Sequence, residues 1–271
     1  MQPTDPQGRG SPQGGGKSPW AGRGIGMVRV LDEDADLGRY LSPSALKLAS
    51  AAAIAPLHTL EEGPASFLMD EPLTHSHQGL LMLSGLIARH VSFGQIGSSE
   101  FYGPGDLLRP WARRGDPSVQ IRWEVLARSR LAALDQDFAN RVRAWPELAS
   151  ALLDRAAERS DSQALQAALH QAKRVEDRVL LALWHFAGRW GQSGPRGRTV
   201  NLPNVTGELL GRFVGARRQS ISTALGQLAD SGALERDRDG GFTLPDAPRE
   251  LETVAPGRRA TDRKPRLRRQ P

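Results

Sequence analysis

Two short helical patterns meet at a single glycine within residues 206–234, and this feature most constrains how the chain can fold. Thr206 can cap a first helix over 207–214, and Gly215 permits a tight turn in which a side chain would be strained. A second helical pattern covers 217–231. Its apolar residues are spaced by four and three positions: Ile221, Leu225 and Leu228. The second helix can therefore pack through one face and leave the other exposed.

The outer face of the second helix carries groups suited to contact with DNA. Arginine can bond bidentately to guanine, glutamine can do so to adenine, and hydroxyl groups can reach a phosphate or a base edge. Four arginines against one glutamate give residues 198–223 a local charge of +3. Taken alone, an Arg-Arg-Gln run is also typical of a solvated helix face. The candidate DNA contacts are Arg217, Arg218, Gln219, Ser220 and Thr223, together with the capping Thr206.

A hairpin pattern follows the second helix. Gly232 ends the helix, and residues 233–236 and 242–244 flank 237–241, where an Asp-Gly pair is typical of a tight turn. The ordered set of helix, glycine turn, polar-faced helix and hairpin is more specific than any of its parts. It predicts a winged helix-turn-helix, a module that places its second helix in the major groove of DNA.

The preceding residues predict a β domain followed by two helices. Ser42 can cap a helix over 42–54. Short apolar runs separated by turn residues between 65 and 134, among them 79–83 and 87–93, predict short strands in a β-sandwich or jelly roll. A long helix is predicted from Pro146 to about residue 171. An amphipathic helix is predicted over 175–190.

The long helix carries a stripe of mostly small residues, and glycines with Pro195 break the chain at 191–197, after the amphipathic helix. Small residues at three- and four-residue spacing allow helices to approach closely. The stripe fits packing on its own domain or on a second copy of the chain, and we favour the second copy. Its members are Ala149, Leu153, Ala157, Ser160, Ala164 and Ala168.

The composition of the two ends of the chain predicts disordered tails over 1–28 and 248–271, because these residues lack the apolar surface needed to offset ordering entropy. The net charge is +6. Residues 249–271 hold eight basic and three acidic groups, and 1–28 hold three basic groups and one acidic group. Removing these +5 and +2 contributions leaves −1 for the body. The high isoelectric point therefore does not by itself indicate a nucleic-acid binder.

The segments Val200 to Thr206 and Val214 to Arg218, with several others, resemble the Crp/Fnr regulators, the family of the cyclic AMP receptor protein. The resemblance implies an α+β chain with a cyclic-nucleotide-binding-like sensor β-roll, or jelly roll, over 35–138. A dimerisation helix over 139–172 and a C-terminal winged helix-turn-helix over 173–247 would follow. The matching segments are Gly103-Pro104-Gly105-Asp106-Leu107-Leu108, Val175-Glu176-Asp177-Arg178-Val179, Val200 to Thr206 with Leu210, Val214 to Arg218, and Ser222 to Leu225 with Leu228 and Gly232.

The resemblance also implies residue roles and partners. The position of Arg218 contacts guanine in family members, whereas Gln219 and Thr223 stand where the family often has Glu and Arg. The preferred operator should therefore differ from that of the best-known member. A bacterial, cytoplasmic homodimer that regulates transcription on a pseudo-palindromic site in double-stranded DNA is implied, and RNA polymerase is a candidate partner.

The sensor region departs from the cyclic-nucleotide binders of the family. A ribose-binding Glu is missing after Asp106, and no Arg occupies the phosphate-binding position in 116–120. Burying a cyclic phosphate without a cation is costly, so we expect no cyclic AMP binding. The chain has no Cys, which excludes a cysteine-ligated iron–sulfur cluster. Arg109 and Trp111 are candidates for binding a small anionic effector.

Other classes of function have weaker support in the sequence. Two histidines, His75 and His77, could suggest a metal site, but a solvated loop fits them better, and we expect no metal or other cofactor. No catalytic pair stands out, no apolar run is long enough to cross a membrane, and residues 1–26 lack the core of a signal peptide. An enzyme with an appended winged helix and a winged helix that binds protein remain alternatives.

Overall fold

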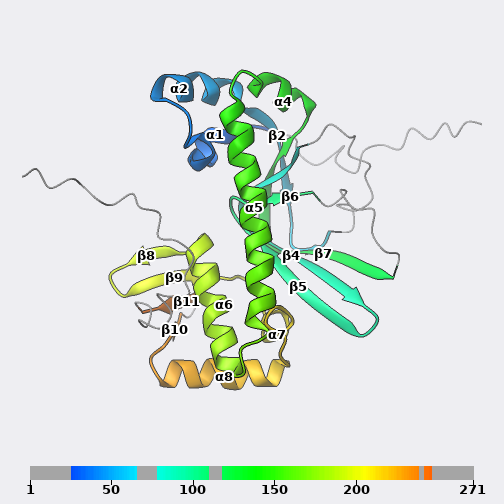
Figure 1. Cartoon of the computed structure of the whole chain (residues 1–271), viewed down its shortest axis with the longest axis vertical. Coiled ribbons are helices and arrows are strands. Elements are labelled where there is room, and N and C mark those ends of the chain that lie inside the picture. The colour runs from blue at the N-terminus through cyan, green and yellow to red at the C-terminus, as the bar shows by residue number, and fades with distance from the viewer. Residues whose placement is uncertain (1–25, 66–77, 110–117, 238–240, 246–271) are drawn as a thin grey trace, which may run out of the picture. The chain divides into compact units, whose positions relative to one another are not determined.

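The computed structural model describes residues 26–65, 78–109, 118–237 and 241–245 (Figure 1). These residues form two compact units, the first ending at Ala168 and the second beginning at Leu169. His75 and His77, for which the sequence favours a solvated loop over a metal site, and almost all of the predicted tails lie outside the described residues. Gly26, Met27 and Val28 are the exception, because they belong to an edge strand although the sequence places them in a tail.

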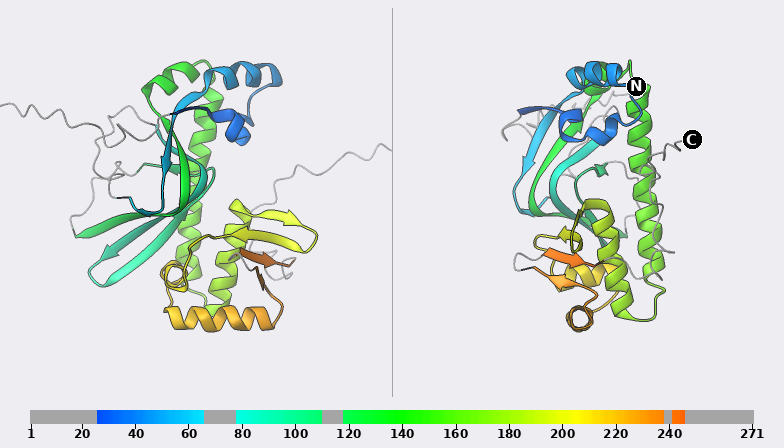
Figure 2. Two further views of the ribbon diagram at one scale, coloured as in Figure 1. Left: turned by 180° about the vertical axis from the view of Figure 1, so that it is seen from behind. Right: turned by 90° about the vertical axis from the view of Figure 1, so that its left-hand side faces the viewer.

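The first unit is built on an antiparallel sheet with the strand order β1-β2-β7-β4-β5, in which β3 pairs with β7 and β6 pairs with β4. Figure 2 shows that this sheet is strongly curved and that a long helix, α5, runs beside it. The strands are β1 (Gly26–Arg29), β2 (Ile54–Leu60), β3 (Gly63–Pro64), β4 (Gly79–Phe93), β5 (Ile96–Tyr102), β6 (Leu107–Leu108) and β7 (Val119–Leu134). The helices are α1 (Val30–Glu33), η1 (Ala35–Gly38), α2 (Pro43–Ala52), α4 (Gln136–Val142) and α5 (Pro146–Leu169).

Two of the strands are much longer than the short runs that the sequence predicts. β4 has 15 residues and β7 has 16. Their pairing shifts register between Met82 and Ile87 instead of breaking. Gly85 makes this possible, because its φ is +94° and a Cβ there would lie 2.5 Å from the carbonyl oxygen of Arg128. The predicted interruption is therefore a β-bulge inside one continuous strand.

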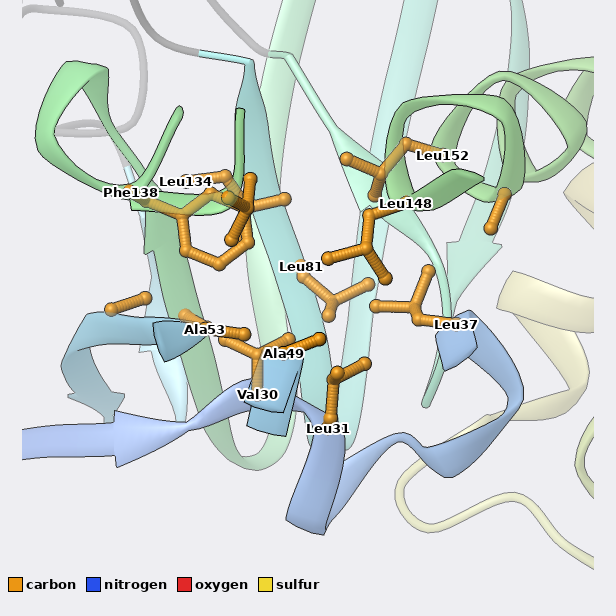
Figure 3. Packing of buried hydrophobic residues seen from close by; sticks show 14 of the residues in the cluster. Val30, Leu31, Leu37, Ala49, Ala53, Leu81, Leu134, Phe138, Leu148 and Leu152 are labelled. Atoms are coloured by element: carbon orange, nitrogen blue, oxygen red, sulfur yellow. The ribbon is translucent and has the colours of Figure 1, made fainter. Parts of the chain in front are cut away.

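Both faces of the sheet are buried where β4 and β7 pair. Leu80 and Leu131 point into one core, whereas Leu81 and Leu134 point into a second one, because successive side chains leave opposite faces of a strand. The second core is covered by residues of α1, α2, α4 and α5 (Figure 3). Burial on both faces explains why these strands show continuous apolar runs instead of alternation.

Side-chain caps fix where two of the covering helices begin. The Ser42 hydroxyl accepts a hydrogen bond from the Ala45 amide at 3.3 Å, which confirms the predicted cap of α2. The Asp135 carboxylate accepts one from the Phe138 amide at 2.8 Å at the start of α4. Each cap satisfies an amide that has no partner within its own helix. No helix in the described part of the chain is long and apolar enough to cross a membrane.

The described residues of the second unit form three helices and a small antiparallel sheet of order β10-β11-β9-β8. The hairpin of β8 and β9 occupies the segment for which the sequence predicts only a break. Gly197 makes it possible, since its φ is +115° and a Cβ there would lie 2.0 Å from the carbonyl oxygen of Leu244. The elements are α6 (Val175–Trp190), β8 (Gln192–Gly194), β9 (Gly197–Asn201), α7 (Gly207–Val214), α8 (Arg218–Asp230), β10 (Glu235–Arg236) and β11 (Gly241–Leu244).

Aromatic side chains pack together in the core of the second unit. The ring centroid of Phe186 lies 4.8 Å from that of Phe213 and 5.6 Å from that of Trp190, with which it is stacked. Helix α6 therefore joins α7 to the rest of its unit. Figure 1 shows α8 lying across one end of α6.

Candidate nucleic-acid interface

Helices α7 and α8 are joined by a turn of three residues, one more than the predicted helices over 207–214 and 217–231 leave between them. The Thr206 hydroxyl accepts a hydrogen bond from the Leu209 amide at 3.2 Å and caps α7. Gly215 ends α7 in the left-handed conformation, with φ 68° and ψ 45°. A side chain would be strained at this position, so the glycine is a conformational requirement of the turn.

A second glycine, which the sequence reasoning missed, sets the distance between the two helices. A Cβ at Gly211 would lie 2.5 Å from the carbonyl oxygen of Ala216 and 3.4 Å from Cγ1 of Ile221. The backbone of α7 therefore lies directly against the turn that precedes α8 and close to the Ile221 side chain of α8. A glycine inside a helix costs about 1 kcal/mol relative to alanine, and that cost was the available signal for a close approach.

The inner face of α8 is apolar, as predicted. Ile221, Leu225 and Leu228 are buried, and Ala224 lies with them. These side chains hold α8 through one face only. The packing thereby determines which polar residues remain on the outside.

The predicted DNA contacts lie mainly on the exposed face at the start of α8. Arg217, Arg218, Gln219 and Thr223 are exposed, and Ser220 is half-buried. Among the described residues, neither Arg217 nor Arg218 forms a salt bridge with a carboxylate. Their positive charges are therefore not neutralised within the unit.

Arg218 is partly oriented by its neighbour on α7. The Cγ atom of Arg218 lies 3.7 Å from the position that a Cβ on Gly207 would occupy. The stem of the arginine side chain therefore passes over the first residue of that helix. Two hydroxyls of α8 are oriented by their own helix instead. Ser222 donates to the Arg218 carbonyl at 3.3 Å, and Thr223 donates to the Gln219 carbonyl at 3.2 Å. Thr223 consequently offers its methyl group and an accepting oxygen to a partner, and its proton is already engaged.

The local positive charge is divided between one internal pair and three other arginines. Arg212 bonds to Glu208 at 2.8 Å across one turn of α7. Arg198, like Arg217 and Arg218, has no carboxylate partner in the described part of the unit. The +3 charge predicted for this region thus comes from these three unpaired side chains.

The predicted wing is present beside α8. Strands β10 and β11 pair through Glu235 with Thr243 and through Arg236 with Phe242. The guanidinium of Arg236 lies over the Phe242 ring, 5.7 Å from its centroid. The Asp-Gly pair of the predicted turn lies outside the described residues.

Only some of the residues of the predicted sensor site lie within the described part of the first unit. Gly103–Asp106, within a segment that resembles the family, forms a turn in which the Gly103 amide donates to the Asp106 carboxylate at 2.9 Å. Arg109 is exposed directly after β6, whereas Trp111 lies outside the described residues. The predicted lack of cyclic AMP binding depends mostly on residues 109–120, of which 110–117 are also outside. These expectations stay predictions.

A mostly buried charge cluster joins α5 to the sheet, and no sequence pattern pointed to it. Arg159 forms a salt bridge with Glu100 of β5 and lies over the Tyr102 ring, 4.0 Å from its centroid. Arg89 bonds to the same carboxylate at 3.1 Å, and Gln163 donates to it at 2.9 Å. Burial alone would raise the pKa of Glu100, but the charges of Arg159 and Arg89 outweigh burial and hold that pKa below its ordinary value.

Comparison with known proteins agrees with this architecture. The fold and the exposed helix define a winged helix-turn-helix protein with an antiparallel β domain at its N-terminus. Residues 177–250 match the family model of the Crp-like helix-turn-helix domain. The chain thus carries a Crp-like helix-turn-helix domain and has the fold of the Crp/Fnr-type transcription regulators, as the sequence predicted.

Three solved structures illustrate the similarity of fold. A cyclic nucleotide-binding domain containing protein from Listeria monocytogenes is 20% identical, with a TM-score of 0.57 over 79% of this chain and 97% of its own. FixK2 from Bradyrhizobium japonicum is 17% identical, with a TM-score of 0.55 over 75% and 98%. A CooA mutant from Carboxydothermus hydrogenoformans is 17% identical, with a TM-score of 0.54 over 73% and 86%. No curated protein sequence matches this chain.

Proposed function

We propose that this chain is a sequence-specific transcription regulator, without enzymatic activity, that binds double-stranded DNA in the cytoplasm. The observation that carries the proposal is the pair of exposed arginines at the start of α8, whose charges have no carboxylate partner in the described residues. An α8 that packs through its apolar face can enter a major groove with this end. Arg218 then reads guanine, Gln219 reads adenine, and Thr223 meets a thymine methyl or a backbone group.

The proposal includes a homodimer formed through α5. All six members of the predicted stripe, Ala149 to Ala168, are exposed, and Leu153 is 71% exposed despite being apolar. The opposite side of α5 is occupied, since Leu148, Ala151 and Gln166 are buried against their own unit. These exposures favour a second copy of the chain over packing on its own domain. Two such copies would present two α8 helices to a pseudo-palindromic operator.

The dimer proposal predicts a change of mass on substitution at Leu153. We expect Leu153→Glu to shift the protein from dimer to monomer in sedimentation experiments, because two carboxylates would be buried in one apolar contact. Lys47→Glu introduces the same acidic side chain on α2 and serves as the matched control. A Leu153→Glu protein that sediments as the same dimer would contradict the assignment of this face.

The DNA proposal is tested by selecting sequences from a random duplex library with the purified protein. We expect a recovered site with two related halves, and an affinity for it that falls steeply with salt because phosphate counterions are released on binding. Recovery of no preferred sequence, with no salt-dependent binding to any duplex, would instead favour a winged helix that binds protein. RNA polymerase is the partner we propose once the site is occupied.

Control by a small anionic effector remains the second proposal for the sensor unit. It depends on Arg109, which is exposed and has no salt bridge among the described residues. Repeating the selection in the presence of a pool of small carboxylates and phosphates tests it. An operator affinity that is the same with and without the pool would favour a regulator whose activity is constitutive.

A further inference from the structure

The residues that follow α5 are hydrogen-bonded to the turn between α7 and α8. His170 lies 43 positions before Phe213, yet its Nε2 donates to the Phe213 carbonyl at 3.0 Å. Arg178 donates through Nε to the Ala172 carbonyl at 2.7 Å and through a terminal nitrogen to the Gly215 carbonyl at 3.2 Å. One guanidinium therefore joins the turn to the linker, by which we mean residues 170–174 between α5 and α6. We call these three bonds the linker clasp.

The clasp is directed at carbonyls of the chain reversal between the two helices. The last four carbonyls of a helix have no partner within that helix, and Phe213 is the next-to-last residue of α7. The Gly215 and Ala216 amides both donate to the Gly211 carbonyl, and the Phe213 carbonyl accepts its hydrogen bond from His170. The positive charge of the Arg178 guanidinium at this end is also favoured by the helix dipole.

Gly215 has a second role in this arrangement. A Cβ at this position would lie 3.2 Å from Cδ2 and 3.3 Å from Nε2 of His170. The imidazole thus lies against the bare glycine, at a distance that a side chain would disturb. The residue that permits the turn also provides the surface on which the linker rests.

We propose that His170 and Arg178 are positioning residues for DNA recognition, because they fix the turn from which Arg217 and Arg218 project. Arg217 lies two residues after Gly215 and directly before the first residue of α8, so a displacement of the turn moves the start of α8. This inference rests on the proposed DNA-binding function only for the expected change in operator affinity. The stiffness of the turn is a property of the free protein.

The first measurement is hydrogen exchange in the free full-length protein, which does not depend on DNA binding. We expect Arg178→Met to speed exchange of the amides of residues 211–221 by about tenfold, since it removes two charge-assisted bonds and keeps most of the side-chain stem. Arg174→Met is the matched control. Arg174 is an exposed arginine of the same segment, and it forms a salt bridge with Glu176 at 3.3 Å. Equal exchange rates in the two variants would overturn the proposal.

The second measurement separates positioning from charge. Arg178→Met and Arg174→Met lose the same charge, so both should weaken binding to random duplex DNA equally. We expect only Arg178→Met to weaken binding to the selected operator further, by about tenfold. His170→Phe should weaken operator binding in the same direction, and His170→Gln, which retains a donor, should restore part of it. Operator affinities that match those of Arg174→Met would refute the positioning role, whereas a wild-type protein without any preferred site would refute the DNA-binding function instead.

Discussion

Arg159 in the first unit and Arg218 in the second have opposite environments. Arg159 is mostly buried and is held by Glu100, the Phe101 carbonyl and the Tyr102 ring. Arg218 is exposed and has no carboxylate partner in the described residues. A buried charge must be compensated within the fold, because transfer from water is costly. An exposed charge without an internal partner remains available to an anionic molecule, so we propose a structural role for Arg159 and a role in recognition for Arg218.

The largest expected effect concerns the buried arginine. Arg159→Met should lower the free energy of unfolding by about 3 kcal/mol, because it leaves the Glu100 carboxylate with fewer partners in a mostly buried site. Urea denaturation provides the measurement, with Arg174→Met as the exposed control that should change stability by less than about 0.5 kcal/mol. Similar losses in the two variants would mean that burial does not distinguish these arginines.

The next effect concerns the exposed arginine. Arg218→Ala should reduce the preference for the operator over random DNA by about 1–3 kcal/mol, roughly 5- to 150-fold, and leave the dimer folded. Titrations of both duplexes at one salt concentration, with thermal unfolding as a check on the fold, measure this directly. Unchanged discrimination would remove Arg218 from the role of reading a base.

A smaller effect is expected from acid. The pKa of Glu100 is lowered in the folded chain, so its stabilising contribution is present above the ordinary carboxyl pKa of 4.5 and is lost as the pH falls through the lowered value. Glu100→Gln cannot titrate at this position. We therefore expect a shallower loss of stability between neutral pH and about pH 3 in Glu100→Gln than in the wild type. Parallel pH profiles would show that this carboxylate is not coupled to folding.

The smallest effect distinguishes two glycines of the recognition module. Gly226 lies on the exposed side of α8 with nothing within 4 Å of a Cβ, whereas a Cβ at Gly211 would collide with the Ala216 carbonyl. Gly226→Ala should stabilise the protein by about 0.5–1 kcal/mol through helix propensity. Gly211→Ala should destabilise it, and differential scanning calorimetry measures both. A loss of stability in Gly226→Ala would indicate that this face of α8 is covered.

The sequence by itself determined the elements whose signals are local. Its prediction for the amphipathic helix agrees with α6, and its caps at Ser42 and Thr206 and its turn at Gly215 are present. These features depend on neighbouring residues, on helix periodicity and on backbone conformation. The same local signals were sufficient for the exposed face of α8, because the spacing of Ile221, Leu225 and Leu228 fixes which residues face outward.

Only the tertiary structure decided the contacts between distant residues. Glu100 and Arg159 are 59 positions apart, and His170 and Phe213 are 43 positions apart. No periodicity within a segment can indicate which distant partner a charged side chain will meet. The continuity of β4 was likewise set by its pairing with β7, where the bulge at Gly85 replaces the predicted break. Local chemistry therefore specified α8 and its exposed face, and long-range packing specified both the buried charge cluster and the linker clasp.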